Sequence, residues 1–222
     1  MHENDSKARI YLVDDHPLVR ESLTNLIDQQ SDMVVCGEAE DAAQAVRDIA
    51  ARQPDVAIMD ISLKSSSGLE LIKLVKAKLP RIGIIVLSMH DEKLYAERCI
   101  RAGARGYVMK GESTKRIIAA IRQVLEGKLC LSGQIAASFA EKFVGKSAPG
   151  GETPLEDLSD RELEVFNLLG RGLETRQVAD SLNVSIKTVQ AYCARIKQKL
   201  RLSTATELLR EAIRWHEQQS AR

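Results

Sequence analysis

Short apolar runs alternate with longer stretches of mixed polarity over the first two thirds of the chain. The apolar runs resemble buried strands and cover residues 9–13, 33–36, 56–59, 83–87 and 106–109. Between them, spacings of three and four predict helices near 17–29, 41–52, 68–78, 92–102 and 114–126. Such spacing is seen in Leu18, Ser22 and Leu26, and again in Leu71, Leu74 and Val75. The alternation predicts an α/β fold, a five-stranded parallel doubly wound sheet of the flavodoxin-like order 2-1-3-4-5.

Polar side chains follow four of the predicted strands. They are Asp14 and Asp15 after the first, Asp60 after the third, Ser88 after the fourth and Lys110 after the fifth. Right-handed crossovers bring the carboxyl ends of parallel strands to one edge, so these groups should meet. Three neighbouring carboxylates repel one another unless a cation lies among them, and a hard cation held by oxygens is typical of Mg²⁺. One of the carboxylates can then act as a nucleophile toward phosphorus.

The last third of the chain reads as helices only. A helical stretch at 133–143 leads into GKSAPGGETP, whose glycine and proline content predicts a flexible connector. We therefore expect a first domain over 1–130, a linker over 131–154 and an all-α four-helix domain over 155–222. Ser159 and Glu162 form a capping-box pattern before the first of these helices. A short helix at 175–182, a turn at Asn183 and a longer helix capped by Ser185 follow the helix-turn-helix plan.

The longer helix has two contrasting faces. We expect its inner stripe to contain Ile186, Val189, Cys193, Ile196 and Leu200. Its outer face carries Lys187, Thr188, Gln190, Ala191, Ala194, Arg195, Lys197 and Gln198. From Arg171 to Arg201 seven basic residues, Lys199 among them, stand against two acidic ones. A stripe of this kind can bind DNA phosphates. Charge alone, however, is explained about equally well by a basic face that is only exposed to solvent.

Four segments together resemble the receiver domain of two-component response regulators. They are LVDDHPLVRESL, VAIMDISLKSSSGLELI, IIVLSMHDE and AGARGYVMK, and the resemblance covers roughly residues 8–127. It implies that Asp60 accepts a phosphoryl group from a sensor histidine kinase, which makes the chain a phosphoprotein. It also implies that Mg²⁺ is held by Asp15, Asp60 and the carbonyl of Ser62, with Asp14 helping through water.

The same resemblance implies a switch. The Ser88 hydroxyl would turn toward the phosphoryl group, the Tyr107 ring would follow inward, and Lys110 would neutralise charge. One departure is Lys64, which stands where the family usually has proline. His16 beside the acidic pair is best explained by its place before Pro17, which opens the first helix.

The helical domain resembles the LuxR-type helix-turn-helix, most specifically in LSDRELEV and VSIKTVQAY. With the receiver, this identifies the chain as a member of the NarL/FixJ type of response regulator. In that family, positions matching Gln190, Ala191 and Ala194 approach bases, and those matching Lys187, Thr188 and Lys197 meet phosphates. Tyr192 stands where histidine is common. The resemblance implies a homodimer on promoter DNA, formed on activation and in part by the fourth helix, whose Leu208, Ile213 and Trp215 we expect to be exposed.

Two other functions were weighed against a phosphorylation-controlled transcription regulator. A haloacid dehalogenase-type phosphatase needs a second acid two residues after the nucleophile, where this chain has Ser62. A receiver-like transcription factor controlled by protein interactions without phosphorylation is kept open by Lys64. We expect a protein that is not an enzyme, apart from its own phosphoryl transfer and dephosphorylation. Net charge of +1, four isolated cysteines, and no signal peptide or membrane-length apolar run predict a cytoplasmic location.

Overall fold

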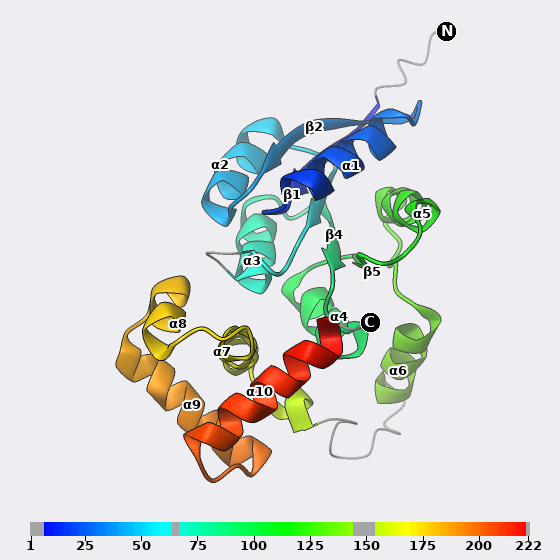
Figure 1. Ribbon diagram of the computed structural model, residues 1–222. Coiled ribbons are helices and arrows are strands. Elements are labelled where there is room, and N and C mark those ends of the chain that lie inside the picture. The colour runs from blue at the N-terminus through cyan, green and yellow to red at the C-terminus, as the bar shows by residue number, and fades with distance from the viewer. Residues whose placement is uncertain (1–6, 64–66, 144–153, 221–222) are drawn as a thin grey trace, which may run out of the picture. The chain divides into compact units, whose positions relative to one another are not determined.

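The computed structural model describes residues 7–63, 67–143 and 154–220 (Figure 1). The chain divides into two compact units, Met1–Ala136 and Ala137–Arg222. Helix α6 (Gly133–Phe143) spans this division, and most of the predicted GKSAPGGETP connector lies outside the described residues. The described part of the chain contains no helix long and apolar enough to cross a bilayer.

The first unit contains five parallel strands and their connecting helices. The strands are β1 (Ala8–Val13), β2 (Met33–Ala39), β3 (Val56–Met59), β4 (Gly83–Ser88) and β5 (Gly106–Met109). The helices are α1 (Pro17–Asp28), α2 (Ala42–Arg52), α3 (Gly68–Lys78), α4 (Glu92–Ala102) and α5 (Thr114–Leu125). The strand order is β2-β1-β3-β4-β5, with every pair parallel, which confirms the predicted fold.

Helices cover both faces of this sheet, as a buried parallel sheet requires. The face toward α1 and α5 forms a core that includes Ile10, Ile58 and Ile121. The other face is covered by α2, α3 and α4 (Figure 1). All four residues of β3 are buried, so the carboxyl end of β3 emerges from the centre of the sheet.

Helices α1 and α3 form where the spacing of apolar residues predicts them, but some of the residues that show this spacing are exposed. In α1 the buried residues are Leu23 and Ile27, whereas Leu18 is 77% exposed. In α3, Leu71 is buried, whereas Leu74, three residues further on, is 52% exposed. A period of three and four fixes which residues share a face, and packing against the sheet then decides which face is buried.

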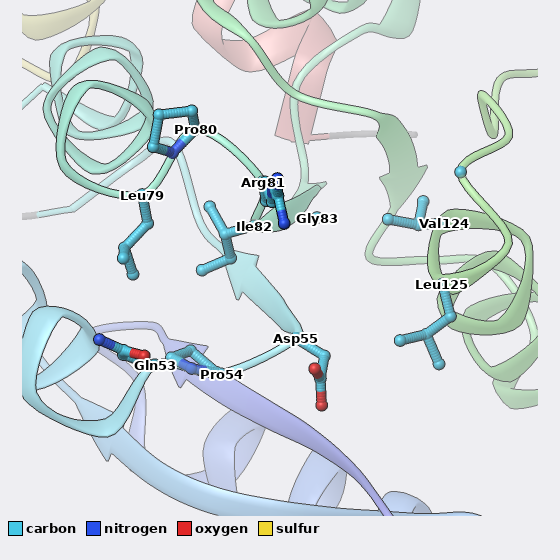
Figure 2. A pocket seen from close by; sticks show the side chains of 11 residues that line it. Gln53, Pro54, Asp55, Leu79, Pro80, Arg81, Ile82, Gly83, Val124 and Leu125 are labelled. Atoms are coloured by element: carbon cyan, nitrogen blue, oxygen red, sulfur yellow. The ribbon is translucent and has the colours of Figure 1, made fainter.

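A cavity of about 590 Å³ lies in the first unit, where β3 and β4 begin. Figure 2 shows its lining, which comes from the turns before β3 and β4 and from the end of α5. Its carboxylate, Asp55, accepts a hydrogen bond of 2.7 Å from the backbone N–H of Arg9. The cavity therefore lies at the opposite edge of the sheet from Asp60, which follows the carboxyl end of β3.

The second unit is helical, as predicted. A 3₁₀ turn, η1 (Pro154–Asp157), precedes α7 (Asp160–Gly170), α8 (Thr175–Leu182), α9 (Ile186–Leu200) and α10 (Ala205–Ser220). Ser159 and Glu162 form the expected capping box at the start of α7. Asn183 ends α8 in the left-handed conformation, with φ of 51°, which confirms the predicted tight turn.

Helices α7 and α10 approach each other closely at a glycine. A Cβ added to Gly170 would lie 2.5 Å from the carbonyl oxygen of Ala212 in α10. Ala212 is itself buried, with 1% of its surface exposed. The two helix backbones are therefore in near contact, and a larger residue at position 170 would separate them.

Candidate functional site

Backbone hydrogen bonds continue past the strands and carry the predicted groups to one edge of the sheet. The Asp60 N–H donates to the Val13 carbonyl at 2.8 Å, and the Lys110 N–H donates to the Ser88 carbonyl at 2.8 Å. The Asp14 N–H donates to the Ala39 carbonyl at 3.1 Å. These bonds extend the parallel ladder by one residue, so the side chains that follow β1, β3 and β5 converge as predicted.

Asp60 is held from two sides at this edge. Its side chain is 2% exposed, and Oδ2 lies 2.6 Å from the Lys110 Nζ. The backbone N–H of Ser62 donates to Oδ1 at 2.8 Å. Lys110 also lies 2.7 Å from Asp14 Oδ2, so one ammonium group serves two carboxylates.

The electrostatics of the site leave Asp60 short of positive charge. Burial raises the pKa of Asp60 above its ordinary value, and Asp14 adds to this, against the lowering by Lys110 and by the Ser62 N–H. For Lys110, burial lowers the pKa, but Asp60 and Asp14 outweigh it and the pKa rises. Lys110 is therefore protonated, while the carboxylates around it exceed the charge it can balance.

The donor set fits a divalent cation. One ligand atom from each of Asp14, Asp15, His16 and Asp60 lies within 4.8 Å of all the others. Carboxylate oxygens are the ligands that Mg²⁺ prefers, and a cation would relieve the excess negative charge. The carbonyl of Ser62 as a further ligand stays a prediction; its peptide N–H is beside Asp60.

Two contacts of this site were missed from the sequence. His16 does precede α1 in extended conformation with Pro17 at the helix start, but its ring also faces the acids. Arg20 donates from Nη1 to the Asp14 carbonyl at 2.7 Å and so fixes the end of β1. His16 directly follows the acidic pair and Arg20 lies in the first turn of α1, six residues from Asp14, and this proximity in sequence is the signal that could have found them.

The proposed switch residues Ser88 and Tyr107 both contact the backbone of His90. Ser88 is fully buried, and its Oγ accepts a hydrogen bond of 3.0 Å from the His90 N–H. The Tyr107 hydroxyl donates to the His90 carbonyl at 2.8 Å, and burial raises the pKa of Tyr107 well above its ordinary value. Tyr107 is 1% exposed, so its side chain is buried in this structure, and the expected inward turn stays a prediction. Lys64 lies outside the described residues.

In the second unit, α9 presents most of its predicted outer face to solvent. Lys187, Gln190, Ala191, Ala194 and Arg195 are exposed, and Thr188 and Lys197 are partly buried. The Thr188 hydroxyl bonds to the Ser185 hydroxyl at 2.8 Å, so it completes the cap of α9. The Arg195 guanidinium lies 5.9 Å from the centre of the Tyr192 ring.

One prediction for the inner stripe of α9 is wrong. Ile186 is 45% exposed because it opens the helix directly after the cap, beyond the buried stripe centred on Val189 and Ile196. Lys199 was only counted among the seven basic residues from Arg171 to Arg201, and its charge is paired within the unit. Its Nζ lies 2.7 Å from Glu162 and 3.0 Å from the Asp157 carbonyl, so its charge is used inside the unit.

Of the three apolar residues of α10 that we expected to be exposed, Ile213 is exposed as predicted, whereas the prediction for Leu208 is wrong. Leu208 is 3% exposed, so its packing is that of a core residue. Leu209 and Ile213 are 42% and 36% exposed and stand one turn apart. Trp215 is partly buried. The apolar stripe available to a partner therefore consists of Leu209 and Ile213.

Comparison with known families supports both units. A model described as the response regulator receiver domain matches residues 10–122. A model described as bacterial regulatory proteins, luxR family, matches residues 156–212. The fold and the acidic edge thus define a receiver joined to a DNA-binding helix-turn-helix.

Full-length relatives share this arrangement. The oxygen regulatory protein NreC of Staphylococcus carnosus is 34% identical over 210 residues, 93% of this chain and 97% of that protein. RcsB of Salmonella enterica serovar Typhimurium, solved on promoter P1flhDC with the phosphomimetic BeF3−, is 25% identical over 93% of this chain and 98% of that chain, with a TM-score of 0.72. A structure of two RcsB dimers on two parallel DNAs is 25% identical over 92% and 98%, with a TM-score of 0.67.

The chain belongs to the response regulators that carry a receiver domain and a LuxR-type DNA-binding domain. It is accordingly a phosphorylation-regulated, DNA-binding transcription regulator. The first unit is called the receiver unit below, and the second the DNA-binding unit.

Proposed function

We propose that Asp60 is the phosphoacceptor and that a sensor histidine kinase is the donor. The observation that carries this is the contact set of Asp60, a buried carboxylate bonded to Lys110 at 2.6 Å and to the Ser62 N–H at 2.8 Å. An Asp60 oxygen forms a bond to phosphorus as the donor's phosphorus–nitrogen bond breaks. Lys110 then faces the transferred group and balances its charge.

In this proposal Asp14, Asp15, Asp60 and the Ser62 carbonyl hold Mg²⁺. The bound ion would neutralise charge that develops on the phosphoryl oxygens. The protein's own residues supply the rest: Arg20 fixes Asp14 through its carbonyl, and Lys110 spans Asp14 and Asp60. The hydroxyl of Ser88 would leave the His90 N–H and turn to the phosphoryl group, a change that Tyr107, bonded to the same residue, would sense.

The output of the proposed switch is a homodimer on promoter DNA in the cytoplasm. The exposed Leu209 and Ile213 of α10 offer a self-complementary apolar stripe for two-fold pairing. The outer face of α9 would then enter the major groove, with Gln190, Ala191 and Ala194 near bases and Lys187, Arg195 and Lys197 near phosphates. The chain would act by binding, with no turnover beyond its own phosphorylation and dephosphorylation.

The acceptor is tested by incubation with acetyl phosphate and Mg²⁺. We expect one acid-stable, base-labile phosphoryl group on the wild type and none on Asp60→Asn, because an amide is a far weaker nucleophile. Asp32→Asn is the matched control, since Asp32 is an exposed carboxylate of the same unit, 3.0 Å from Arg122. Labelling of Asp60→Asn to the wild-type level would overturn the assignment.

A further inference from the structure

His16 places a nitrogen donor among the carboxylates of the receiver unit. Its Nδ1 is 2.8 Å from Asp15 Oδ1 and 3.2 Å from Asp14 Oδ1. It belongs to the group of four donor residues, completed by Asp60, whose ligand atoms lie within 4.8 Å of one another. The site therefore differs from one built of oxygen donors alone.

The two distances fit neighbouring positions in one coordination shell. In an octahedral shell with bonds of about 2.1 Å, adjacent donor atoms lie about 3 Å apart. The separations of 2.8 and 3.2 Å from His16 to the two carboxylates lie on either side of this value. A cation held by these carboxylates would thus find the imidazole at the distance of an adjacent ligand.

The backbone holds the ring in this place. The His16 N–H donates to Asp14 Oδ1 at 2.9 Å, and its carbonyl accepts from Val19 at 3.1 Å. The following Pro17 restricts His16 to the extended conformation observed, with φ of −99° and ψ of 111°. The side chain is 59% exposed, so the ring forms the solvent side of a site whose carboxylates are buried.

Imidazole changes which cations such a site favours. Carboxylates and water suit Mg²⁺ and Mn²⁺, whereas imidazole suits later first-row ions. We propose that His16 is a ligand of the receiver metal site and that it gives this site a selective affinity for ions such as Co²⁺. This inference rests on the metal site of the proposed function and adds to it a nitrogen ligand and a metal preference.

The competing explanation is an ion pair, in which a protonated His16 only neutralises Asp14 and Asp15. The two explanations predict opposite effects of removing the ring. A lost ligand weakens the binding of Co²⁺ and leaves Mg²⁺ almost unaffected. A lost positive charge strengthens the binding of both ions, because the carboxylates become more negative as a group.

The experiment titrates the full-length protein with Co²⁺ alone and with Mg²⁺ alone, by calorimetry and, for Co²⁺, by visible absorption. We expect His16→Ala to lower the Co²⁺ affinity by about tenfold or more and to change the Mg²⁺ affinity by less than about twofold. The Co²⁺ absorption bands should shift in His16→Ala and in His16→Gln, since both lose the nitrogen donor. The His16 side chain is 59% exposed, so both variants should fold as the wild type does, and a thermal melt checks this.

Two controls separate the possible failures. His216→Ala removes an imidazole from α10 of the DNA-binding unit and should leave both titrations as in the wild type, whereas Asp15→Asn should weaken the binding of both ions. A wild type that binds neither ion would overturn the metal site of the proposed function. Mg²⁺ binding with a Co²⁺ affinity that is unchanged, or raised, in His16→Ala would overturn the role of His16 alone.

Discussion

The receiver unit and the DNA-binding unit each bury a carboxylate against a lysine from a distant part of the chain. In the receiver unit, Asp60 lies 2.6 Å from Lys110, and its side chain is 2% exposed. In the DNA-binding unit, Glu162 lies 2.7 Å from Lys199, and its side chain is 4% exposed. By distance and burial the two pairs are nearly the same.

Their pKa shifts have opposite directions. Burial raises the pKa of Asp60, with help from Asp14, by more than its partners lower it. Burial also raises the pKa of Glu162, but Lys199 and Ser159 outweigh burial, so the net pKa is lowered. The difference arises from the other neighbours, which are carboxylates around Asp60 and a helix cap around Glu162.

The comparison distinguishes Glu162, a carboxylate that stabilises the fold, from Asp60, a carboxylate whose surroundings suit a reaction. The charge of Glu162 is satisfied, since it accepts from the Ser159 N–H at 2.8 Å and from Lys199. Asp60 shares its lysine with Asp14, so its charge is only partly balanced. Acids with pKa values raised in this way are characteristic of functional sites.

The largest difference should appear in the rate of phosphorylation. Lys110→Ala should slow phosphoryl transfer from acetyl phosphate by roughly 10²–10³-fold, the usual effect of removing one preorganised charge partner of a transition state. Lys199→Ala should leave the rate at the wild-type value. Initial rates of label incorporation measure both effects. Equal rates for the two variants would contradict the distinction between a functional Asp60–Lys110 pair and a structural Glu162–Lys199 pair.

The opposite pattern should appear in stability. Glu162→Gln should lower the free energy of unfolding of the DNA-binding unit by about 1–3 kcal/mol at pH 7, because the cap weakens and Lys199 loses its partner. A depressed folded pKa stabilises above the unfolded pKa, and this contribution is lost as pH falls through the folded value. The difference from wild type should therefore begin to shrink as the pH falls below the unfolded glutamate pKa of about 4.3, and it should vanish below the lower folded pKa of Glu162. Urea unfolding at several pH values measures it, with Glu164→Gln, whose partner is Arg161 at 2.9 Å, as control.

The exposed face of α9 should affect DNA binding and not stability. Gln190→Ala should cost about 1–3 kcal/mol on the preferred base at one position, since a glutamine amide can bond adenine N6 and N7 together. Lys197→Ala should weaken all sequences alike and flatten the salt dependence. Binding to a panel of variant sites at two salt concentrations distinguishes them. Identical binding profiles for the two variants would contradict the proposal that α9 lies in the major groove.

The smallest effect is a gain in stability at Asp60. Asp60→Asn should raise the free energy of unfolding of the receiver unit by roughly 0.5–2 kcal/mol at pH 7, as when a functional site is relaxed. A raised folded pKa means that the folded protein binds this proton more tightly than the unfolded chain does, so the gain should shrink as the pH falls through the folded pKa of Asp60 toward the unfolded value of about 3.9. Thermal melts with Asp32→Asn as reference measure it. A loss of stability would show that the Asp60–Lys110 pair is structural, like that of Glu162.

The sequence predicted the sheet and the acidic edge because both follow from rules of chain geometry. Strand ends of a parallel sheet share an edge, so Asp14, Asp60 and Lys110 had to converge once the strands were recognised. The ring of His16 could not be placed in this way, because its direction depends on one local bond, from its N–H to Asp14.

Helix periodicity left a different kind of gap. Leu208 and Leu209 are neighbours in α10, and periodicity alone did not decide which of the two packs inward. Lys199 was counted in the basic patch because its partner, Glu162, is 37 residues away in the sequence and does not enter a count of charges from Arg171 to Arg201. Both cases concern contacts between helices, which a pattern within one helix does not contain.

The near contact of Gly170 with the Ala212 carbonyl has a consequence for reading DNA. It clamps α10 onto α7, and α7 in turn holds α9 through the bond of Glu162 to Lys199. In the proposed dimer, pairing through α10 would then fix the distance between the two α9 helices. This distance must match half-sites about 34–36 Å apart. A larger side chain in place of Gly170 would change the distance between the two α9 helices. The same amino acids on α9 would then select operators whose half-sites are spaced differently.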